Sequence, residues 1–572
     1  MNGRVVGIDL GTSNSVVCAV VDGEAIVIPD GEGQKIQPSV VSFLPDGRTI
    51  VGRQAKSRMA IDPLNTIYSA KRLIGRPFYA PEINLAISKY AYQIVKGSDE
   101  NPKIFLRGRH YSIEEVQAII LRQMKKIAEN YLGEAVTRAV ITVPANFNEP
   151  QRQSTKIAGE LAGLEVMRIL NEPTAAALAY GYDQQLRERI AVYDLGGGTF
   201  DITVLELRDN VFEVLSTAGD TFLGGDDFDH RIAQMIVDRF EQQFNYDMST
   251  APGAMQRLKA VSERIKTTLS EQESASAMVK QMVPGTGSPS TLDFTLARHQ
   301  FDANAMDIVQ QTFVVCDEAL KLANLTSAEV DRLVLVGGST RMPIVRDMVE
   351  NYFFKQPLTT INPDEIVAVG AAIYAYGLEE ADMSSTNIPS LDSSDFEIVS
   401  DGAGAPSAGF QANPAAGASG SFLTGGFAGT QKLGGAPLLI DVTPHALGIE
   451  TVGGFTDTII KRNASIPTRN TRTFATAIDN QDSVRLNILE GEGKRAEENR
   501  ILGELVLFDI PPAKRGNVKI DVSFEIDPDG ILKVSARDTN TNQVQQVRIN
   551  LAGSLGTEAR TAAADNLPAS VF

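Results

Sequence analysis

The first 380 residues alternate between short aliphatic runs and longer stretches of helical periodicity. The aliphatic runs are rich in β-branched residues and have the length of buried strands; the clearest are residues 5–9, 139–143, 190–194 and 333–336. Between them, residues 113–132 and 151–161 repeat apolar positions every three or four residues, as one face of a helix does. The alternation predicts that residues 1–380 form an α/β domain on mostly buried sheets.

The pattern changes twice after residue 380. Gly and Ala make up 19 of the 36 residues from Asp401 to Ala436. Such a segment buries too little apolar surface to offset the entropy of ordering it, so we expect a flexible tether over residues 381–436. Strand-like alternation then returns, most clearly at residues 484–489, 519–526 and 531–536, and it predicts an all-β domain over residues 442–552. We expect the short polar segment 553–572 to be a disordered tail.

Composition narrows the class of protein. The chain has 572 residues and a formal net charge of −18, which argues against a nucleic-acid surface or an anionic membrane as its partner. No apolar run approaches the roughly 20 residues needed to cross a bilayer, and the start of the chain turns polar too early for a signal peptide. Two cysteines, Cys18 and Cys316, cannot build a disulfide framework. We therefore expect a cytoplasmic protein with no nucleic-acid or membrane partner.

Two similar glycine turns follow predicted strands and carry the candidate chemistry. Gly7-Ile-Asp-Leu-Gly-Thr-Ser-Asn14 and Asp194-Leu-Gly-Gly-Gly-Thr-Phe-Asp201 each combine carboxylates with backbone N–H groups and hydroxyls that can bind phosphate. The three glycines permit close approach to a polyphosphate, and the carboxylates can hold hydrated Mg²⁺. Neither turn contains the lysine of a P-loop, so a metal ion would have to offset the local negative charge. The repeat predicts two related lobes.

A third glycine turn, Gly337-Gly-Ser-Thr-Arg341, suits an adenosine, with Gly338 against the base and Arg341 beside it. In this order the three turns resemble those of the actin, sugar-kinase and heat-shock ATPase superfamily, whose members bind ATP between two lobes. Further segments are similar to the DnaK-type seventy-kilodalton heat-shock chaperones; they are residues 70–75, 142–148, 171–181, 219–229, 362–372, 440–444, 448–450 and 529–538. The resemblance covers nearly all of residues 3–380 and 437–552. It implies a two-lobed actin-like α/β ATPase domain, an apolar linker at 437–441 and a β-sandwich that binds peptides.

The resemblance also implies a site that hydrolyses ATP to ADP with Mg²⁺, and K⁺ is a candidate second cation. Lys71 and Glu172 would position the γ-phosphoryl group and the attacking water. The residues implied to act in catalysis are Asp9, Lys71, Glu172, Asp194, Thr199 and Asp201, of which Asp9, Asp194 and Asp201 would hold Mg²⁺ through water. The residues implied to bind the nucleotide are Gly11, Thr12, Ser13, Asn14, Gly196, Gly197, Gly198, Thr199, Gly224, Gly225, Asp226, Glu263, Lys266, Ser270, Gly337, Gly338, Ser339, Arg341 and Asp364.

In the β domain, the resemblance implies capture of unfolded or extended polypeptides through their backbone, with one pocket for an aliphatic side chain. The residues implied to line this slot are Ile449, Val452, Phe474, Ala477, Val484, Leu486 and Ile520. On periodicity alone each of them is equally well an ordinary core residue of a sandwich.

Coupling between the domains is implied to run through Pro144, Arg152, Arg168, Leu438, Leu439 and Asp441. The linker would dock on the ATPase domain when ATP is bound, and full burial of its three aliphatic side chains is worth roughly 4–6 kcal/mol. The positions implied to engage a J-domain co-chaperone are Arg168, Asn171, Thr174 and Asp441. A nucleotide-exchange factor is the other implied partner, and we expect a monomer.

Several positions depart from the family pattern. Ser13 stands for a threonine, Asn146 for an aromatic residue, Phe222 for a histidine and Asp226 for a glutamate, and Pro437 is unusual at the start of the linker. Lys71 and Glu172 are kept, so hydrolysis should survive. The long tether and the expected absence of a helical lid predict fast peptide exchange even with ADP bound.

The leading interpretation is an ATP-dependent chaperone that binds extended apolar segments. The alternative is a regulatory or scaffold protein that uses the same nucleotide switch to hold one dedicated partner, which the tether favours. A small-molecule kinase of the same superfamily would leave the β domain without a purpose.

Overall fold

The computed structural model describes residues 3–182, 186–208, 210–251, 254–284, 288–358, 362–386, 437–508, 510–539, 544–547 and 557–568. The predicted tether lies outside these ranges from residue 387 onward. Its first six residues belong to helix α10 (Ile366–Thr386), so the expected domain boundary at residue 380 falls too early. Immediately before that position the helix is held in place, since Leu378 packs on the core and Glu379 pairs with Arg138.

The first lobe is built on a sheet of order β12–β11–β1–β2–β3, with β4 also paired to β2. β1 runs parallel to β11 and antiparallel to β2, so the turn after β1 lies at the carboxyl edge of the parallel strands. The strands of this sheet are β1 (Arg4–Leu10), β2 (Asn14–Val21), β3 (Glu24–Val27), β4 (Gln37–Pro38), β11 (Val136–Val143) and β12 (Glu165–Asn171). Helices α3 (Ile113–Leu132) and α4 (Glu149–Leu161) match the predicted helices closely and begin with capping boxes.

The outer part of this lobe adds two small sheets of order β6–β5–β7 and β10–β9–β8. Their strands are β5 (Val41–Phe43), β6 (Thr49–Val51), β7 (Thr66–Ile67), β8 (Gln93–Lys96), β9 (Pro102–Leu106) and β10 (Arg109–Ser112). Helices α1 (Arg53–Arg58) and α2 (Pro81–Lys89) accompany them. Aliphatic side chains from these sheets, from the main sheet and from α3 share one hydrophobic core.

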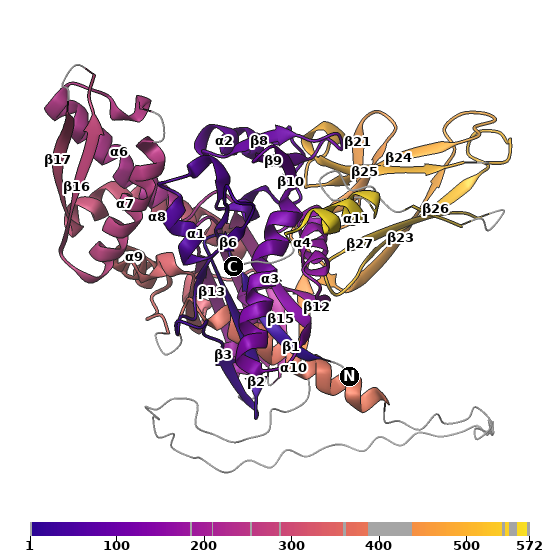
Figure 1. Cartoon of the computed structure of the whole chain (residues 1–572). Coiled ribbons are helices and arrows are strands. Elements are labelled where there is room, and N and C mark those ends of the chain that lie inside the picture. Colours follow the sequence, from indigo (N-terminus) through magenta and orange to yellow (C-terminus); the bar gives the residue numbers. More distant parts are fainter. Residues whose placement is uncertain are drawn as a thin grey trace, which may run out of the picture.

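The second lobe repeats this plan. Its sheet has the order β18–β13–β14–β15–β19–β22, in which β13 runs parallel to β18 and antiparallel to β14. The first four of its strands are β13 (Arg187–Leu195), β14 (Phe200–Arg208), β15 (Val211–Asp220) and β18 (Arg332–Val336). Its outer part, at the left of Figure 1, contains α6 (Gly225–Phe244), α7 (Ala254–Glu271), α8 (Arg298–Leu322), α9 (Pro343–Phe353), β16 (Ser274–Met282) and β17 (Pro289–Ala297). The predicted pair of related lobes is therefore present.

The two lobes meet where α5 (Glu172–Gly181) crosses α10. Gly370 lies so close to α5 that a Cβ atom there would stand 1.7 Å from the carbonyl oxygen of Ala175. The surrounding core contains Ala176 and Ala371. The helices therefore approach almost backbone to backbone.

The β domain is a sandwich of two four-stranded sheets, ordered β21–β20–β24–β25 and β23–β26–β27–β28. The strands are β20 (Leu447–Thr451), β21 (Phe455–Ile460), β23 (Thr468–Ala475), β24 (Val484–Glu490), β25 (Arg500–Leu507), β26 (Lys519–Ile526), β27 (Leu532–Asp538) and β28 (Val544–Val547). The three strands predicted most clearly from the sequence are β24, β26 and β27. Their inward residues share one aliphatic core with β20 and β25.

The apolar linker forms strand β19 (Leu438–Val442) and joins the two domains in one sheet. It pairs in parallel with β15 of the second lobe and, through Asp441 and Val442, antiparallel with β22 (Ser465–Ile466) of the β domain. In Figure 1 the sandwich, in orange and yellow, lies beside α4. We call this arrangement, with β19 on β15 and the sandwich against α4, the docked arrangement.

The predicted disordered tail is wrong for its central part. Residues Thr557–Asn566 form helix α11, which lies against the first lobe. Ala563 packs on Ile157 of α4, and Asn566 Nδ2 donates to Glu115 Oε1 at 2.7 Å. The tail is ordered because its few apolar residues find a partner surface outside their own segment.

Candidate functional site

The three glycine turns converge between the lobes. Gly197 faces the first turn so closely that a Cβ atom there would lie 1.9 Å from Ser13 Oγ. Gly337 has a φ of 82°, in the left-handed region that favours glycine, and a Cβ atom there would lie 2.4 Å from the carbonyl oxygen of Leu195. Ser339 Oγ donates to the carbonyl oxygen of Gly196 at 2.8 Å. The packing of the turns therefore requires these glycines.

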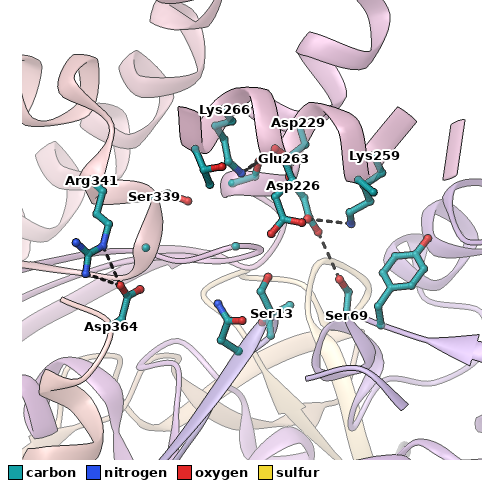
Figure 2. Close-up of a pocket in the computed structure, with 18 of the residues that line it drawn as sticks. Ser13, Ser69, Asp226, Asp229, Lys259, Glu263, Lys266, Ser339, Arg341 and Asp364 are labelled. Atoms are coloured by element: carbon teal, nitrogen blue, oxygen red, sulfur yellow. Dashed lines mark hydrogen bonds and ion pairs between the residues drawn. The ribbon is translucent and has the colours of Figure 1, made fainter. Parts of the chain in front are cut away.

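A cavity of about 560 Å³ opens between the lobes beside these turns (Figure 2). Its walls include most of the residues that the sequence assigned to nucleotide binding: Thr12, Ser13, Asn14, Gly197, Gly225, Asp226, Glu263, Lys266, Ser270, Gly338, Ser339, Arg341 and Asp364. A volume of this size is typical of small-molecule and cofactor sites. The polar groups come from both lobes, so a ligand here would bridge them.

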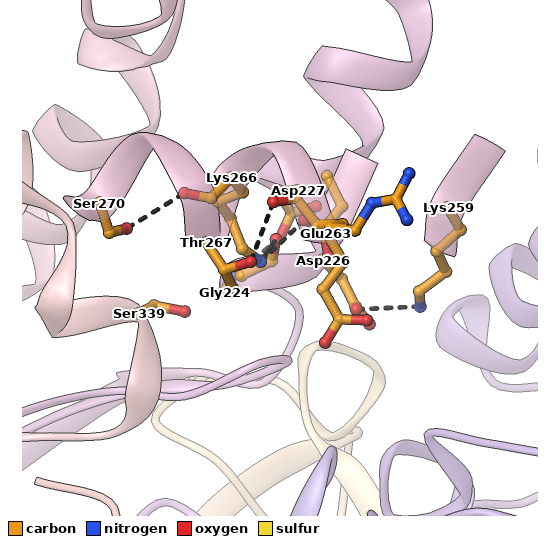
Figure 3. Close-up of polar contacts among 12 residues, drawn as sticks. Gly224, Asp226, Asp227, Lys259, Glu263, Lys266, Thr267, Ser270 and Ser339 are labelled. Carbon is orange, nitrogen blue, oxygen red and sulfur yellow. Dashed lines mark hydrogen bonds and ion pairs between the residues drawn. The ribbon is translucent and has the colours of Figure 1, made fainter. Parts of the chain in front are cut away.

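Helix α7 supplies one wall of the cavity. Glu263, Lys266 and Ser270 recur at spacings of three and four residues, which places them on one face of the helix. Lys266 Nζ lies 2.8 Å from Asp229 Oδ1 and donates to the carbonyl oxygen of Gly225 at 3.0 Å. Figure 3 shows Lys266 beside the start of α6, where the N–H of Gly224 donates to Asp227. The lysine thus fixes α7 against the first turn of α6.

Arg341 and Asp364 form the opposite wall. Their side chains pair at 2.7 Å, and the guanidinium also donates to Asn362. The pair keeps the Arg341 side chain along the cavity wall, where an adenine ring could stack on its plane.

A second, smaller cavity of about 80 Å³ continues the site toward the strand ends. It shares Thr12, Ser13, Asn14, Gly197, Gly338 and Asp364 with the larger one. Its remaining predicted members are Asp9, Gly11, Glu172, Asp194, Gly196, Thr199 and Gly337. The large cavity therefore leads to the acidic residues. Gly198 and Gly224 line neither cavity; they pack behind the turn, Gly198 against the Arg72 guanidinium and Gly224 against Gly197 and Gly198.

Four carboxylates cluster at this inner end. Burial and the neighbouring Glu172 raise the pKa of Asp9 to about 7, although Lys71 opposes both. Burial and nearby carboxylates also raise the pKa values of Asp194 and Asp201 well above the usual range. Lys71 is 2 % exposed, and its Nζ lies 2.6 Å from Glu172 Oε1. One lysine cannot balance four carboxylates, so the cluster favours binding of a cation.

Mg²⁺ fits this donor set. Among the residues that the structure describes, no group of three or more His, Cys, Asp or Glu side chains lies close enough to ligate a metal ion directly. Mg²⁺ usually keeps several of its waters, so Asp9, Asp194 and Asp201 would hold it through its water shell. The hydroxyl of Thr142 fixes Asp9 by a 3.0 Å hydrogen bond, and the N–H of Asn146 donates to Asp201 at 3.3 Å.

Three residues that the sequence did not single out tie the lobes together. Lys259 of α7 lies 2.9 Å from Asp226 Oδ1 within the second lobe, and its Nζ stands 4.6 Å from the ring centroid of Tyr68 in the first lobe. The Arg72 guanidinium of the first lobe lies 3.8 Å from the Asp226 carboxylate. Across the cavity mouth, Lys56 Nζ donates to Glu263 at 2.8 Å. Arg72 could have been found from the sequence because it follows Lys71 in a segment that resembles the family. Lys259 and Lys56 lie in no such motif.

The departure at Phe222 has a structural counterpart. Its ring lies under two guanidinium groups, with the Arg72 and Arg76 carbons 5.2 and 5.7 Å from the ring centroid. This cation–π stack takes the place of a histidine and holds Arg72 toward Asp226.

The predicted coupling residues connect the acidic cluster to the linker. Buried Arg152 donates to the carbonyl oxygens of Ala145 and Phe147 in the loop that begins at Pro144, and to Asn171 Oδ1 at 2.7 Å. Asn171 and Thr174 in turn donate to Asp441 of β19 at 2.6 and 3.4 Å. Arg168 lies apart from Asp441 in this network; its guanidinium lies 3.7 Å from Asp529 of the sandwich.

The linker is less buried than expected. Leu438 is 57 % exposed, and Leu439 and Ile440 are only partly buried, Leu439 against the core around Phe212. The full-burial figure of roughly 4–6 kcal/mol is therefore too high, because part of the linker's aliphatic surface remains in solvent. Backbone pairing with β15 supplies the rest of the contact.

The seven predicted slot residues do not share one environment. Ile449 and Ile520 are 0 and 1 % exposed within the sandwich core, and Phe474, Val484 and Leu486 pack partly buried against it. Val452 is 84 % exposed, and Ala477 is also exposed. In this arrangement Ile449 and Ile520 serve as core residues, and the slot stays a prediction.

Two further observations bear on the class of protein. No helix in the described ranges has the length and apolar character that crossing a membrane would require. The family model of the Hsp70 proteins matches residues 5–395 and 411–565, which is most of the chain. With two lobes around an acidic, glycine-lined cavity and a β-sandwich joined by a linker, the chain belongs to the Hsp70 family and is an ATP-binding ATPase of the chaperone class.

Proposed function

We propose that the sandwich of this ATPase binds extended apolar segments of unfolded polypeptides, and that ATP binding and hydrolysis control its affinity. The proposal deepens the family's general chaperone activity. The observation that carries it is the shared sheet: β19 pairs with β15 of the ATPase domain and with β22 of the sandwich at the same time. A shift of the second lobe is therefore transmitted directly to the sandwich.

The polar path from the acidic cluster supports the same coupling. Asp201 accepts from Asn146, whose loop accepts from Arg152, and Arg152 reaches Asp441 of the linker through Asn171. Loss of the γ-phosphate would alter the charge at Asp201, and the change would reach β19 through four hydrogen-bonded steps. J-domain and nucleotide-exchange partners, and a cytoplasmic location, belong to this proposal.

Single-turnover ATP hydrolysis with and without an unstructured, leucine-rich peptide tests the proposal. We expect several-fold stimulation by the peptide and none by a control peptide in which serine replaces each leucine. A hydrolysis rate that neither peptide changes would overturn the proposed coupling and favour the scaffold alternative.

A further inference from the structure

Two buried carboxyl groups face each other across the docked interface. Glu149 is the first residue of α4 in the ATPase domain, and Glu490 is the last residue of β24 in the sandwich. They are 5 and 7 % exposed, and both line a small cavity of about 20 Å³ between the domains. Among the described residues, neither carboxyl oxygen of Glu149 has a hydrogen-bond partner of good geometry. The sandwich thus buries an acid that its own domain does not pair.

The charges around the pair are unequal on its two sides. Glu149 is faced by the carboxylates of Glu490 and Asp527 and by Arg500 of β25. Arg152 lies one turn along α4 and lines the same cavity, but its guanidinium donates hydrogen bonds to Phe147, Ala145 and Asn171. Glu490 is faced by His445 and Arg500, with Glu492 beyond, and His445 Nδ1 lies 3.7 Å from Glu492. Positive charge therefore favours ionised Glu490, whereas Glu149 meets mainly negative charge.

Separation of the domains would return both carboxyl groups to water. Two carboxylates buried together in a water-poor cavity repel each other and lose hydration; a proton on one of them removes the repulsion and most of that group's desolvation cost. We propose that docking of the sandwich is linked to protons through this pair, with the docked arrangement holding on Glu149 a proton that the separated domains release.

The directions of the pKa shifts of Glu149 and Glu490 agree with this geometry. Burial, together with the carboxylates of Glu490 and Asp527, raises the pKa of Glu149 well above its usual range, although the N–H of Leu532 and Arg500 oppose this. Burial also raises the pKa of Glu490, but His445 and Arg500 lower it. A group whose pKa is higher when docked binds more protons there, so docking strengthens as pH falls and weakens as pH rises through that raised pKa.

A pair of dyes on the full chain measures docking directly. Exposed Met278 in the second lobe and exposed Ile478 in the sandwich can be changed to cysteine, since the native Cys18 and Cys316 are both buried. Energy transfer is read between pH 5.5 and 8.5 with saturating Mg²⁺ and a non-hydrolysable ATP analogue. We expect the docking constant to fall as pH rises, by up to about tenfold per pH unit where one proton is exchanged.

Three variants locate the proton. Glu149→Gln should flatten the pH profile and raise docking at high pH. Glu490→Gln should keep a profile moved to lower pH, because burial still acts on Glu149. The matched control Glu525→Gln changes an exposed glutamate of β26 and should leave the profile unchanged. The proposal is overturned if the docking constant of Glu149→Gln depends on pH as steeply as that of the wild type. It is also overturned if the pH dependence disappears in His445→Gln but persists in Glu149→Gln.

The inference rests on the proposed function in one respect, which is that docked and separated arrangements interconvert. Exchange of the ATP analogue for ADP at constant pH tests that point separately. A nucleotide response without a slope difference between wild type and Glu149→Gln refutes only the proton linkage. No response to either variable refutes the proposed coupling.

Discussion

Replacing Asp529 with alanine should separate the sandwich from the ATPase domain. Asp529 lies in the turn between β26 and β27 and is nearly buried against the first lobe. Its carboxylate accepts from Lys156 Nζ at 2.6 Å and from the N–H of Ile169 at 3.1 Å, and the Arg168 guanidinium lies 3.7 Å away. One carboxylate therefore contacts three groups of the other domain, two through hydrogen bonds and one through a longer ion pair.

The contacts set the size of the effect. A hydrogen bond to a charged group contributes about 1.5–3 kcal/mol, and a buried N–H left without a partner costs about 1–3 kcal/mol. The side chains of Lys156 and Arg168 are 26 and 21 % exposed, so solvent weakens their share. We expect a loss of about 3 kcal/mol of docking free energy, or on the order of 100-fold in the docking constant. Asp529→Asn keeps an acceptor for Ile169 and should cost about half as much.

Hydrogen exchange of the β19 amides in the ATP-bound protein measures this loss, because their pairing with β15 exists only when the linker is docked. Glu525→Ala, an exposed change on the same sheet, is the matched control. Unchanged protection in Asp529→Ala would refute the assignment of docking energy to this turn. Equal effects of the alanine and asparagine variants would refute the role given to the Ile169 hydrogen bond.

Three further changes probe the site and the linker. Lys71→Ala should slow single-turnover hydrolysis by on the order of 10²-fold, as loss of a preorganised charge does, while calorimetry still detects ATP binding; a rate near wild type would contradict the assigned role. Leu439→Ala should weaken docking about fivefold, since a partly buried leucine contributes about 1 kcal/mol, and Leu438→Ala should change it little; energy transfer between the dyes compares them, and the reverse order would contradict the observed burial. Although burial opposes it, Lys259 and Arg72 lower the pKa of Asp226 to about 2, so Asp226→Asn should reduce stability at neutral pH by about 2 kcal/mol. This difference should be full above pH 4 and vanish toward pH 2, as read from thermal unfolding across pH; a constant difference would refute the charge effect.

The parts of the fold that the sequence predicts well are those with local signals. The strand before each glycine turn is apolar and β-branched, and the turn residues themselves carry the phosphate-binding groups. Consecutive residues therefore form one wall of the cavity, and a local pattern is enough to predict it. Asp9 and Asp194 end equivalent strands of two similar lobes, and the repeat alone brings them together.

The contacts between domains have no such signal. Lys156 and Asp529 are separated by 373 positions, and each reads as an ordinary surface charge. Glu149 reads as a first-turn helix acid, and only the position of β24 shows that it is buried against a second acid. Ile449 and Ile520 occupy apolar positions of an alternating strand pattern, which fits a peptide-binding slot and a sandwich core equally well. Only their burial in the folded chain distinguishes a slot residue from a core residue. Order in α11 depends on the contact of Ala563 with Ile157, which is far away in the sequence, and the composition of the segment alone does not reveal that contact.

The crossing of α5 and α10 bears on how the lobes can move. Interlocked large side chains would have to climb out of one another's grooves during a rotation, and each step would meet a barrier. Here the closest approach is that of Gly370 to Ala175, and Ala176 and Ala371 in the same core are equally small, so the faces that meet at this point are nearly smooth. Such faces let the two helices slide over each other with little side-chain repacking, so we expect a shear motion at this crossing to meet only a small barrier. Opening and closing of the cleft would then be limited by the ion pairs at its mouth, and the base of the molecule would offer little resistance.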